Sequence, residues 1–164
     1  MTATTEIQFR PIAAGDGEFL LEVYASTRDD VAAAMLDGAE KSQFLQMQFN
    51  AQHQYYQATF PDARYQIILF DDVPVGRLYV DRPGNEIHVI DIALLPRYRR
   101  QGIGTRLMSD ILEEAARTHL PVRIYVEHYN SALSWYEKLG FVMVEDLQTH
   151  YQMQWRSSPA TASE

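Results

Sequence analysis

The spacing of apolar and polar residues predicts one strand and two helices in the first part of the chain. Apolar and polar side chains alternate from Thr4 to Ile12, as in a half-buried strand. Apolar residues then recur every three or four positions over residues 17–36 and again over residues 39–59, which is the period of a helix. We expect the first of these helices to break near Ser26 to Arg28.

The middle of the chain predicts three antiparallel strands. Arg64 to Phe70 is rich in β-branched and aromatic residues, and a tight turn over residues 71–74 leads into a similar run from Val75 to Asp81. A second turn, Arg82 to Asn85, leads into a buried central strand from Ile87 to Leu95. Because both connections are short, neighbouring strands are expected to pair antiparallel.

The central strand is followed by a break at Pro96, a basic loop and a helix from Thr105 to Thr118. The next strand, Val122 to Val126, comes after this crossover helix and should therefore lie parallel to the central strand. Two adjacent parallel strands that diverge at their carboxyl ends open a crevice beside the helix N-terminus. The pattern thus predicts a crevice next to the basic loop.

The C-terminal part predicts a short helix and a hairpin. Asn130 or Ser131 would cap a helix that stops at Gly140. Two strands follow, from Phe141 to Glu145 and from His150 to Trp155. The short connection between these strands predicts that they pair antiparallel.

The basic loop has the chemistry of an anion site. The first turn of a helix has N–H groups without intrahelical partners and lies at the positive end of the helix dipole. Gly102 and Gly104 have no Cβ to hold a ligand away from these N–H groups, and Arg99 and Arg100 would add charge-assisted contacts. A phosphate or pyrophosphate group is the expected ligand.

Composition narrows the class of protein. The 164 residues, 46% of them hydrophobic, suit a single domain, expected at residues 1–156, with a polar and disordered tail at 157–164. A formal net charge of −8 argues against broad nucleic-acid binding. Cysteine is absent, and no group of histidines and carboxylates has metal-ligand spacing, so we expect no metal. No leader peptide or membrane span is recognisable, which predicts a soluble cytoplasmic protein without a membrane partner.

Two motifs resemble those of the GCN5-related N-acetyltransferase (GNAT) family. The first is Arg99-x-x-Gly102-x-Gly104 after a strand that ends at a proline, and the second is Asn130-x-Ala-x-x-x-Tyr136-x-x-x-Gly140-Phe141. For the first motif alone, the alternative is an ordinary basic turn that caps a helix. A Rossmann dinucleotide site is disfavoured because the G-x-G-x-x-G order and the acidic residue about 20 positions later are missing.

The resemblance implies a fold class and a cosubstrate. The fold would be α/β (α+β), with a mixed, mostly antiparallel sheet of six to seven strands, one splayed parallel pair and about four flanking helices. The splay would admit the pantetheine arm of acetyl-CoA, the expected acyl donor. The residues implied to bind it lie on the central strand, in the basic loop and in the second motif: Ile92, Ala93, Leu94, Arg99, Arg100, Gln101, Gly102, Ile103, Gly104, Thr105 and Asn130.

The resemblance also implies catalytic groups for acetyl transfer to an amine. Tyr136 lies where the family's usual general acid lies, and we expect it to protonate the departing CoA sulfur. His88 lies where some members carry a catalytic glutamate, and Glu86 lies two residues earlier on the same face, so either one, directly or through water, would be the base. Asp91 lies on the opposite face unless the strand is bulged, and we interpret it as structural.

The helix expected over residues 39–59 is rich in glutamine and aromatics and poor in charge, so part of it should face a partner, a dimer mate or a cavity. The resemblance implies that helices in this region form one wall of the acceptor groove. His53, Tyr55 and Tyr56 are then candidate contacts for a small-molecule or peptide amine, and the alternative is that they are packing aromatics. A homodimer through this helix or the last strands is a further hypothesis.

Two other functions compete with the N-acetyltransferase. One is a non-catalytic acyl-CoA-binding or sensor module of the same fold, which would not need the Tyr136 phenol. The other is a phosphate-binding interaction domain unrelated to CoA, which the second motif disfavours. Affinity for CoA separates the last reading from the first two, and thioester turnover separates the enzyme from the sensor.

Overall fold

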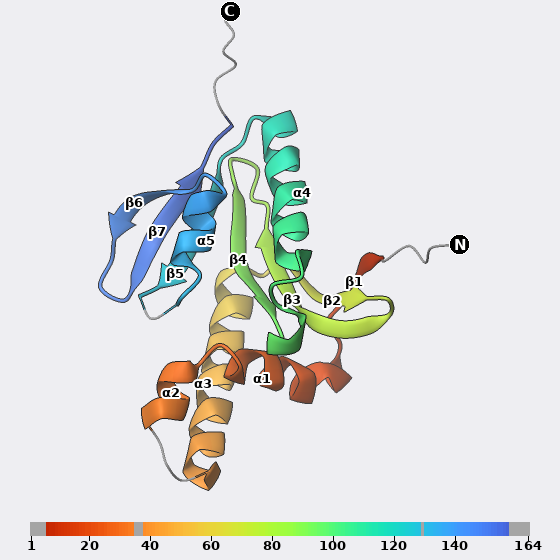
Figure 1. Cartoon of the computed structure of the whole chain (residues 1–164), viewed down its shortest axis with the longest axis vertical. Helices are drawn as coiled ribbons and strands as arrows, with labels where there is room; N and C mark the ends of the chain where they lie inside the picture. The colour runs from red at the N-terminus through yellow and green to blue at the C-terminus, as the bar shows by residue number, and fades with distance from the viewer. Residues whose placement is uncertain (1–5, 35–37, 129, 158–164) are drawn as a thin grey trace, which may run out of the picture.

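A computed structural model describes residues 6–34, 38–128 and 130–157. Its centre is a seven-stranded sheet in the order β1-β2-β3-β4-β5-β7-β6 (Figure 1). The strands are β1 (Ile7–Pro11), β2 (Arg64–Phe70), β3 (Val73–Asp81), β4 (Ile87–Leu94), β5 (Val122–Glu127), β6 (Val142–Asp146) and β7 (His150–Trp155). Every neighbouring pair is antiparallel except β4 and β5, as the sequence predicts.

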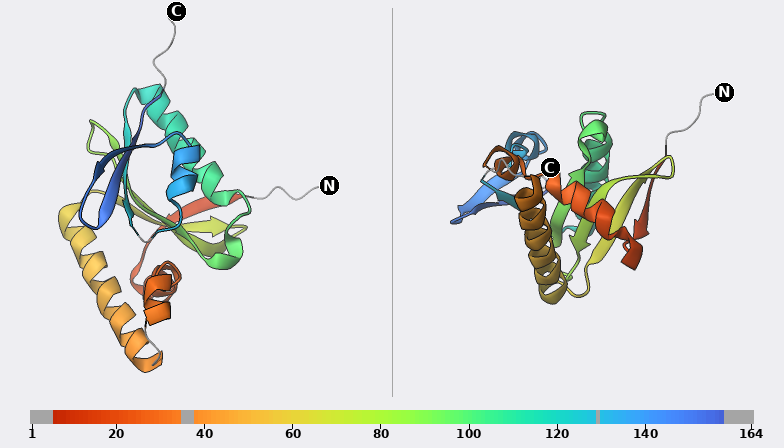
Figure 2. Two further views of the ribbon diagram at one scale, coloured as in Figure 1. Left: turned by 60° about the vertical axis from the view of Figure 1, so that its left-hand side comes forward. Right: turned by 90° about the horizontal axis from the view of Figure 1, so that it is seen from below.

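Helices cover both faces of the sheet. The described residues form five α-helices: α1 (Gly17–Ala25), α2 (Asp29–Ala34), α3 (Gly38–Thr59), α4 (Ile103–Thr118) and α5 (Leu133–Lys138). Figure 2 shows α3 and α4 on opposite sides of the sheet. The expected break near Ser26 to Arg28 separates α1 from α2 and raises the helix number above the four predicted.

Three predictions fall in part on residues outside the described ranges. These are the start of the first strand at Thr4 and Thr5, the end of the first helix at residues 35–36, and the polar tail at residues 158–164. The single-domain boundary at residue 156 stays a prediction. Within the described ranges, no helix combines the length and the apolar character needed to cross a bilayer.

The two faces of the sheet have separate cores. Leu107, Met108 and Ile111 of α4 belong to the larger core, which also takes buried residues from β3, β4 and β5. A smaller core on the other face joins α1 and α3 to β2 through Leu20, Tyr24, Phe49 and Ile67. The apolar face of α4 is therefore buried against the sheet, as its helical period predicts. The alternating side chains of the strands enter the core on one face of the sheet or the other, as their period of two predicts.

The parallel pair separates soon after it forms. β4 and β5 are paired only from Ile87 and Val122 to Val89 and Ile124. Beyond Val89 the two strands share no pairing, while β4 continues to pair with β3 as far as Leu94. The predicted splay is therefore present.

A bulge at Ile90 changes the direction of the following side chains of β4. Val89 and Asp91, which flank Ile90, pair with the consecutive residues Val80 and Tyr79 of β3, so Ile90 is one extra residue. The extra residue turns His88 and Asp91 to the same face: the His88 ring packs against Phe60, and Asp91 accepts a hydrogen bond from Tyr56. Strict alternation, which would put Asp91 on the opposite face, fails for this reason.

Candidate functional site

The glycine loop leaves the N-terminus of α4 open. Gly102 precedes α4 with a φ of 84°, and no side chain caps this end of the helix. Such a backbone conformation favours glycine, which has no Cβ to clash. The N–H groups of Ile103, Gly104 and Thr105 thus have neither intrahelical partners nor a cap, and they form the cradle expected of a pyrophosphate site.

The two predicted phosphate-binding arginines differ in their contacts. Arg99 is tied to the protein, because Nε donates to the carbonyl oxygen of Leu94 at 2.8 Å and Nη2 donates to the carbonyl and hydroxyl oxygens of Ser26 at 3.3 and 3.1 Å. Arg100 is exposed on a left-handed backbone with a φ of 61°. Arg99 therefore holds the loop against the break between α1 and α2, and Arg100 presents its guanidinium to solvent.

Gln101 and Thr105 fix the loop from either side. The Gln101 side-chain amide donates to the carbonyl oxygen of Arg97 at 2.8 Å, and the Thr105 hydroxyl accepts from Trp135 Nε1 at 3.1 Å. The Trp135 ring also lies 3.6 Å from the position that a Cβ on Gly104 would take. These contacts hold the cradle in one shape before any ligand binds.

The crevice side of β4 presents an unpaired backbone edge. Ile92, Ala93 and Leu94 pair with β3 on one side only, because β5 has already separated from β4 on the other. An extended chain that contains amides can add to such an edge in the way a strand does. The pantetheine arm of CoA is a chain of this kind.

A cavity of about 680 Å³ lies beside the carboxyl end of β5. Its lining comes from α1, α3, the end of β5 and the turn before β7: Tyr24, Arg28, Gln48, Ala51, Gln52, Tyr55, Glu127, His128, Gln148, Thr149 and His150. Tyr55 is thus the one predicted acceptor contact among its described lining residues. His53 stacks on Phe49 with ring centroids 5.8 Å apart, and the Tyr56 hydroxyl lies 3.5 Å from Asp91.

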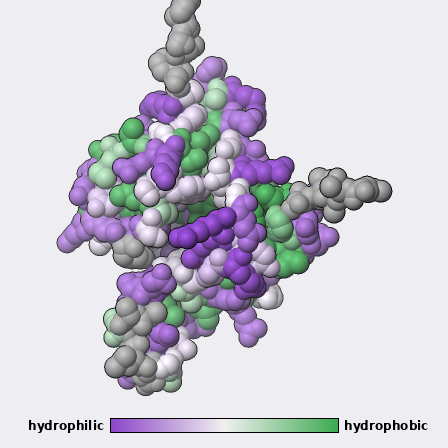
Figure 3. Space-filling view, in the orientation of Figure 1, coloured by the Kyte–Doolittle hydropathy of each residue, from purple (hydrophilic) through white to green (hydrophobic). Residues whose placement is uncertain are grey.

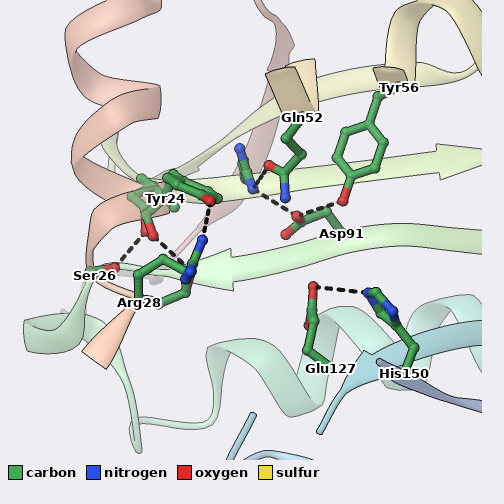
Figure 4. Close-up of polar contacts among 11 residues, drawn as sticks. Tyr24, Ser26, Arg28, Gln52, Tyr56, Asp91, Glu127 and His150 are labelled. Carbon is green, nitrogen blue, oxygen red and sulfur yellow. Dashed lines mark hydrogen bonds and ion pairs between the residues drawn. The ribbon is translucent and has the colours of Figure 1, made fainter. Parts of the chain in front are cut away.

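Four polar groups converge between the splay and the cavity. Figure 4 shows Asp91 of β4 and Glu127 of β5 reaching into the same space, with Tyr56 entering from α3. The fourth group is Tyr136 of α5, which is 4% exposed and whose hydroxyl has no hydrogen-bond partner among the described residues. Burial raises the pKa of this phenol, and the charges of Asp91 and Glu127 raise it further.

Glu127 is the functional candidate that the sequence interpretation missed. It ends β5, and its Oε1 lies 3.8 Å from His150 Nε2. Burial raises the pKa of Glu127 and the charge of Asp91 adds to this, while His150 and Asn130 oppose it. The alternation of β5 could have identified Glu127. Val122, Ile124 and Val126 enter the larger core, whereas Glu127 lies on the opposite face of the strand, together with Arg123.

His88 and Glu86, the predicted bases, are not among the described residues that line the cavity. His88 is 3% exposed and lies edge-on to Phe60 and Tyr125, with ring centroids 5.0 and 5.6 Å away. Burial, with the charge of Arg123, lowers the pKa of His88 to about 4, so its ring is neutral. Glu86 forms an ion pair with Arg123 just before β4 begins.

Asn130 lies in the turn between Glu127 and α5, whose N-cap is Ala132 rather than the expected Asn130 or Ser131. Its Oδ1 accepts a hydrogen bond from the backbone N–H of Ala132 at 2.8 Å, and its own N–H donates to the carbonyl oxygen of Glu127 at 2.9 Å. Asn130 also lowers the pKa of the Glu127 carboxyl. Asn130 therefore links the turn before α5 to the end of β5.

The family is decided by a match over the central part of the chain. The family model described as "Acetyltransferase (GNAT) family" matches residues 32–141, which is more than half of the 164 residues. The chain belongs to the GNAT family. The resemblance drawn from the two motifs is confirmed, because both lie largely or wholly within the matched range.

This GNAT protein has relatives whose names specify a type of amine. It is 31% identical to N-alpha-acetyltransferase 50 from Danio rerio over 104 residues, which are 59% of this chain and 60% of that one. It is 36% identical to an N-alpha-acetyltransferase from Sulfurisphaera tokodaii over 67 residues, 39% of this chain and 40% of that one. The matches thus span about 60% and 40% of the length of these curated relatives.

Solved structures share the fold over nearly the whole chain. The PaiA N-acetyltransferase from Thermoplasma acidophilum, crystallised with coenzyme A, has a TM-score of 0.68 at 18% identity and covers 93% of this chain and 99% of its own. The ribosomal-protein-S18-alanine N-acetyltransferase from Escherichia coli has a TM-score of 0.58 at 16% identity, with 97% and 99% covered. These likenesses confirm the predicted fold class.

Proposed function

We propose that this GNAT protein transfers an acetyl group from acetyl-CoA to an amine. The observation that carries the proposal is the splay of β4 and β5, with the anion cradle after the end of β4 and the cavity at the end of β5. The pyrophosphate would bind the N–H groups of Ile103 and Gly104, and the pantetheine arm would add to the edge of β4. The thioester would then lie beside Tyr136.

The transfer needs a neutral amine, a stabilised oxyanion and a proton for the leaving thiolate. The acceptor's ammonium gives one proton to a base, and the amine lone pair forms a C–N bond to the thioester carbonyl carbon. The C–S bond breaks as the thiolate takes a proton from Tyr136, and the amide nitrogen returns its surplus proton to the phenolate. The raised pKa of Tyr136 keeps the phenol protonated until a thiolate forms.

Glu127 is the base that the geometry favours. It lines the cavity, and its raised pKa makes it a better proton acceptor than an ordinary carboxylate. His88, with a pKa lowered to about 4, and Glu86, paired with Arg123, stay predictions and would have to act through water. We therefore propose Glu127 as the base.

The proposed acceptor is the α-amine of a peptide. The names of both curated relatives support an α-amine. The cavity contains Gln48, Gln52 and Gln148, whose carboxamides offer both donors and acceptors to a peptide backbone. Among the described residues of the lining, Glu127 is the one carboxylate, which suits a single amine better than a polyamine. A small-molecule amine is the alternative acceptor.

Three matched acceptors test this function, with turnover read as free thiol released from acetyl-CoA. They are a peptide with a free N-terminus, the same peptide with a blocked N-terminus and a free lysine, and spermidine. We expect kcat/KM for the first to exceed the others by about tenfold or more. Turnover on the polyamine alone would contradict the acceptor class, and CoA binding without turnover on any acceptor would favour the sensor module.

Arg100→Gln is expected to weaken CoA binding about tenfold, because it removes a charge-assisted contact to the pyrophosphate while the backbone cradle remains. Isothermal titration calorimetry with CoA measures this. Arg117→Gln is the matched control, since Arg117 lies in the last turn of the same helix. An unchanged Kd in the Arg100 variant would remove Arg100 from the proposed cradle.

The edge strand β6 is the surface that best suits the hypothesis of a homodimer. β6 ends the sheet, and its Val142, Met143 and Val144 are 63%, 46% and 52% exposed. Hydrophobic surface is visible over this hairpin on the left of Figure 3. An exposed apolar edge is able to pair with a second strand. Dimerisation stays a prediction, and molar mass by light scattering tests it.

A further inference from the structure

We propose that the buried pair Arg77–Asp91 is a positioning unit for acetyl transfer, which holds a fixed negative charge beside Glu127 and so keeps Glu127 able to take the acceptor's proton. This inference rests on the function proposed above. The pair lies outside both sequence motifs, and neither residue was expected to take part in the chemistry.

Arg77 is a charged residue in the middle of the sheet. It is 2% exposed on β3, and its Nη2 donates to Asp91 Oδ2 at 2.7 Å and to Gln52 Oε1 at 2.9 Å. Its Cζ lies 5.0 Å from the centroid of the Tyr79 ring, and its Nε has no partner among the described residues. A buried ion pair that is incompletely hydrogen-bonded is a poor source of stability, because apolar residues of similar size usually serve as well. Stability alone therefore does not explain it.

The bulge at Ile90 gives the pair its direction. Without the extra residue Asp91 would point into the larger core, whereas with it Asp91 points to the face that α3 covers. The strand order is β3, β4, β5, so Asp91 lies between Arg77 and Glu127. The Asp91 carboxylate therefore lies on the Glu127 side of the pair, and the Arg77 guanidinium lies on the far side.

Glu127 is surrounded by groups from several elements. These are Asp91 of β4, Tyr56 of α3, Tyr136 of α5, Asn130 before α5, His150 of β7, and His128, Tyr24 and Arg28 across the cavity. Burial and the charge of Asp91 raise the pKa of Glu127, whereas a backbone hydrogen bond, His150 and Asn130 lower it, and the net direction is upward. The charge of Arg28 is compensated by both carboxylate oxygens of Asp30, each at 3.0 Å.

Two carboxylates that share one crevice divide their roles by environment. Asp91 is held in an ion pair with Arg77, and the charge of Asp91 disfavours ionisation of the neighbouring Glu127. Glu127 accepts a proton from the acceptor's ammonium, becomes neutral and later releases the proton to water. Asp91 exchanges no proton in this cycle, so it acts only through Glu127.

The test removes both charges together, because Asp91→Asn alone would leave Arg77 buried without a counter-ion. In the double variant Arg77→Gln/Asp91→Asn, we expect the acidic limb of the kcat/KM profile to move to lower pH. The ratio of kcat/KM at pH 6 to that at pH 8 should rise about threefold or more. A purely structural pair would change the melting temperature and leave this ratio unchanged.

Two control variants accompany the double variant. Arg82→Gln/Glu114→Gln removes another arginine–carboxylate pair, with a 2.8 Å contact near α4, and should keep the wild-type profile. Arg77→Lys keeps the cation and should also retain the wild-type limb. A folded double variant whose acidic limb of kcat/KM is not shifted would overturn the proposal. A shifted acidic limb in the Arg82/Glu114 variant would also overturn it, because the effect would then not be specific to the Arg77–Asp91 pair.

A carboxyl ¹³C NMR titration gives a readout that needs neither turnover nor a folded variant. In the wild-type protein we expect Glu127 to titrate above an ordinary glutamate, because burial and the charge of Asp91 raise its pKa. A Glu127 that titrates at or below the pKa of an ordinary glutamate would overturn the proposal. Absence of turnover on every acceptor would instead refute the proposed function, and the titration would still decide whether the pKa of Glu127 is raised.

Discussion

Tyr136→Phe is expected to lower kcat about a hundredfold or more while the affinity for CoA stays within about twofold of wild type. The phenol is 4% exposed and packs in the larger core, and its hydroxyl has no hydrogen-bond partner among the described residues. Removing it takes away the proton for the thiolate but no contact with the pyrophosphate. Thiol release measures kcat, and calorimetry with CoA measures the affinity.

Tyr151→Phe is the matched control for this experiment. Tyr151 lies on β7, its ring packs against His128, and it is not among the described residues that line the cavity. Its loss of one hydroxyl should change kcat by about twofold at most. A Tyr136→Phe enzyme with wild-type turnover would show that the leaving thiolate is protonated by another group, such as water.

Local patterns predicted much of the fold. The turn at residues 71–74 and the periodicity of α4 depend on residues close in sequence, so their elements were predictable with small errors at the ends. The parallel pair followed from the length of the crossover between β4 and β5. The glycine loop was also predictable from local sequence, because a helix N-terminus and its glycines lie within a few residues of one another.

The arrangement of the carboxylates was not predictable in this way. The bulge at Ile90 depends on the register between β3 and β4, which no short pattern reports, and it reverses the expected direction of Asp91. Arg77 appears in sequence as an ordinary polar position of a hairpin strand, and its burial depends on the distant α3. His88 matched a family position by counting, but its packing against Phe60 depends on the residues that follow α3.

Glu127→Gln should lower kcat/KM at neutral pH about a hundredfold and abolish the acidic limb of its pH profile. Burial, with the charge of Asp91, raises the pKa of Glu127, so the fraction of ionised base rises with pH and activity is lost as pH falls through that pKa. The same shift has the opposite effect on stability. The folded chain binds this proton more tightly than the unfolded chain, so the free energy of unfolding falls as pH rises from the unfolded to the folded pKa.

Because glutamine has no such proton, Glu127→Gln should be at least as stable as wild type above neutral pH while its activity is lost. Thermal unfolding and thiol release, both followed from pH 5.5 to 9, separate the two effects. Glu113→Gln, on the exposed side of α4, should change neither. The acidic limb could instead persist in Glu127→Gln and disappear in Glu86→Gln or His88→Gln. The base would then be the residue expected from the sequence, acting through water.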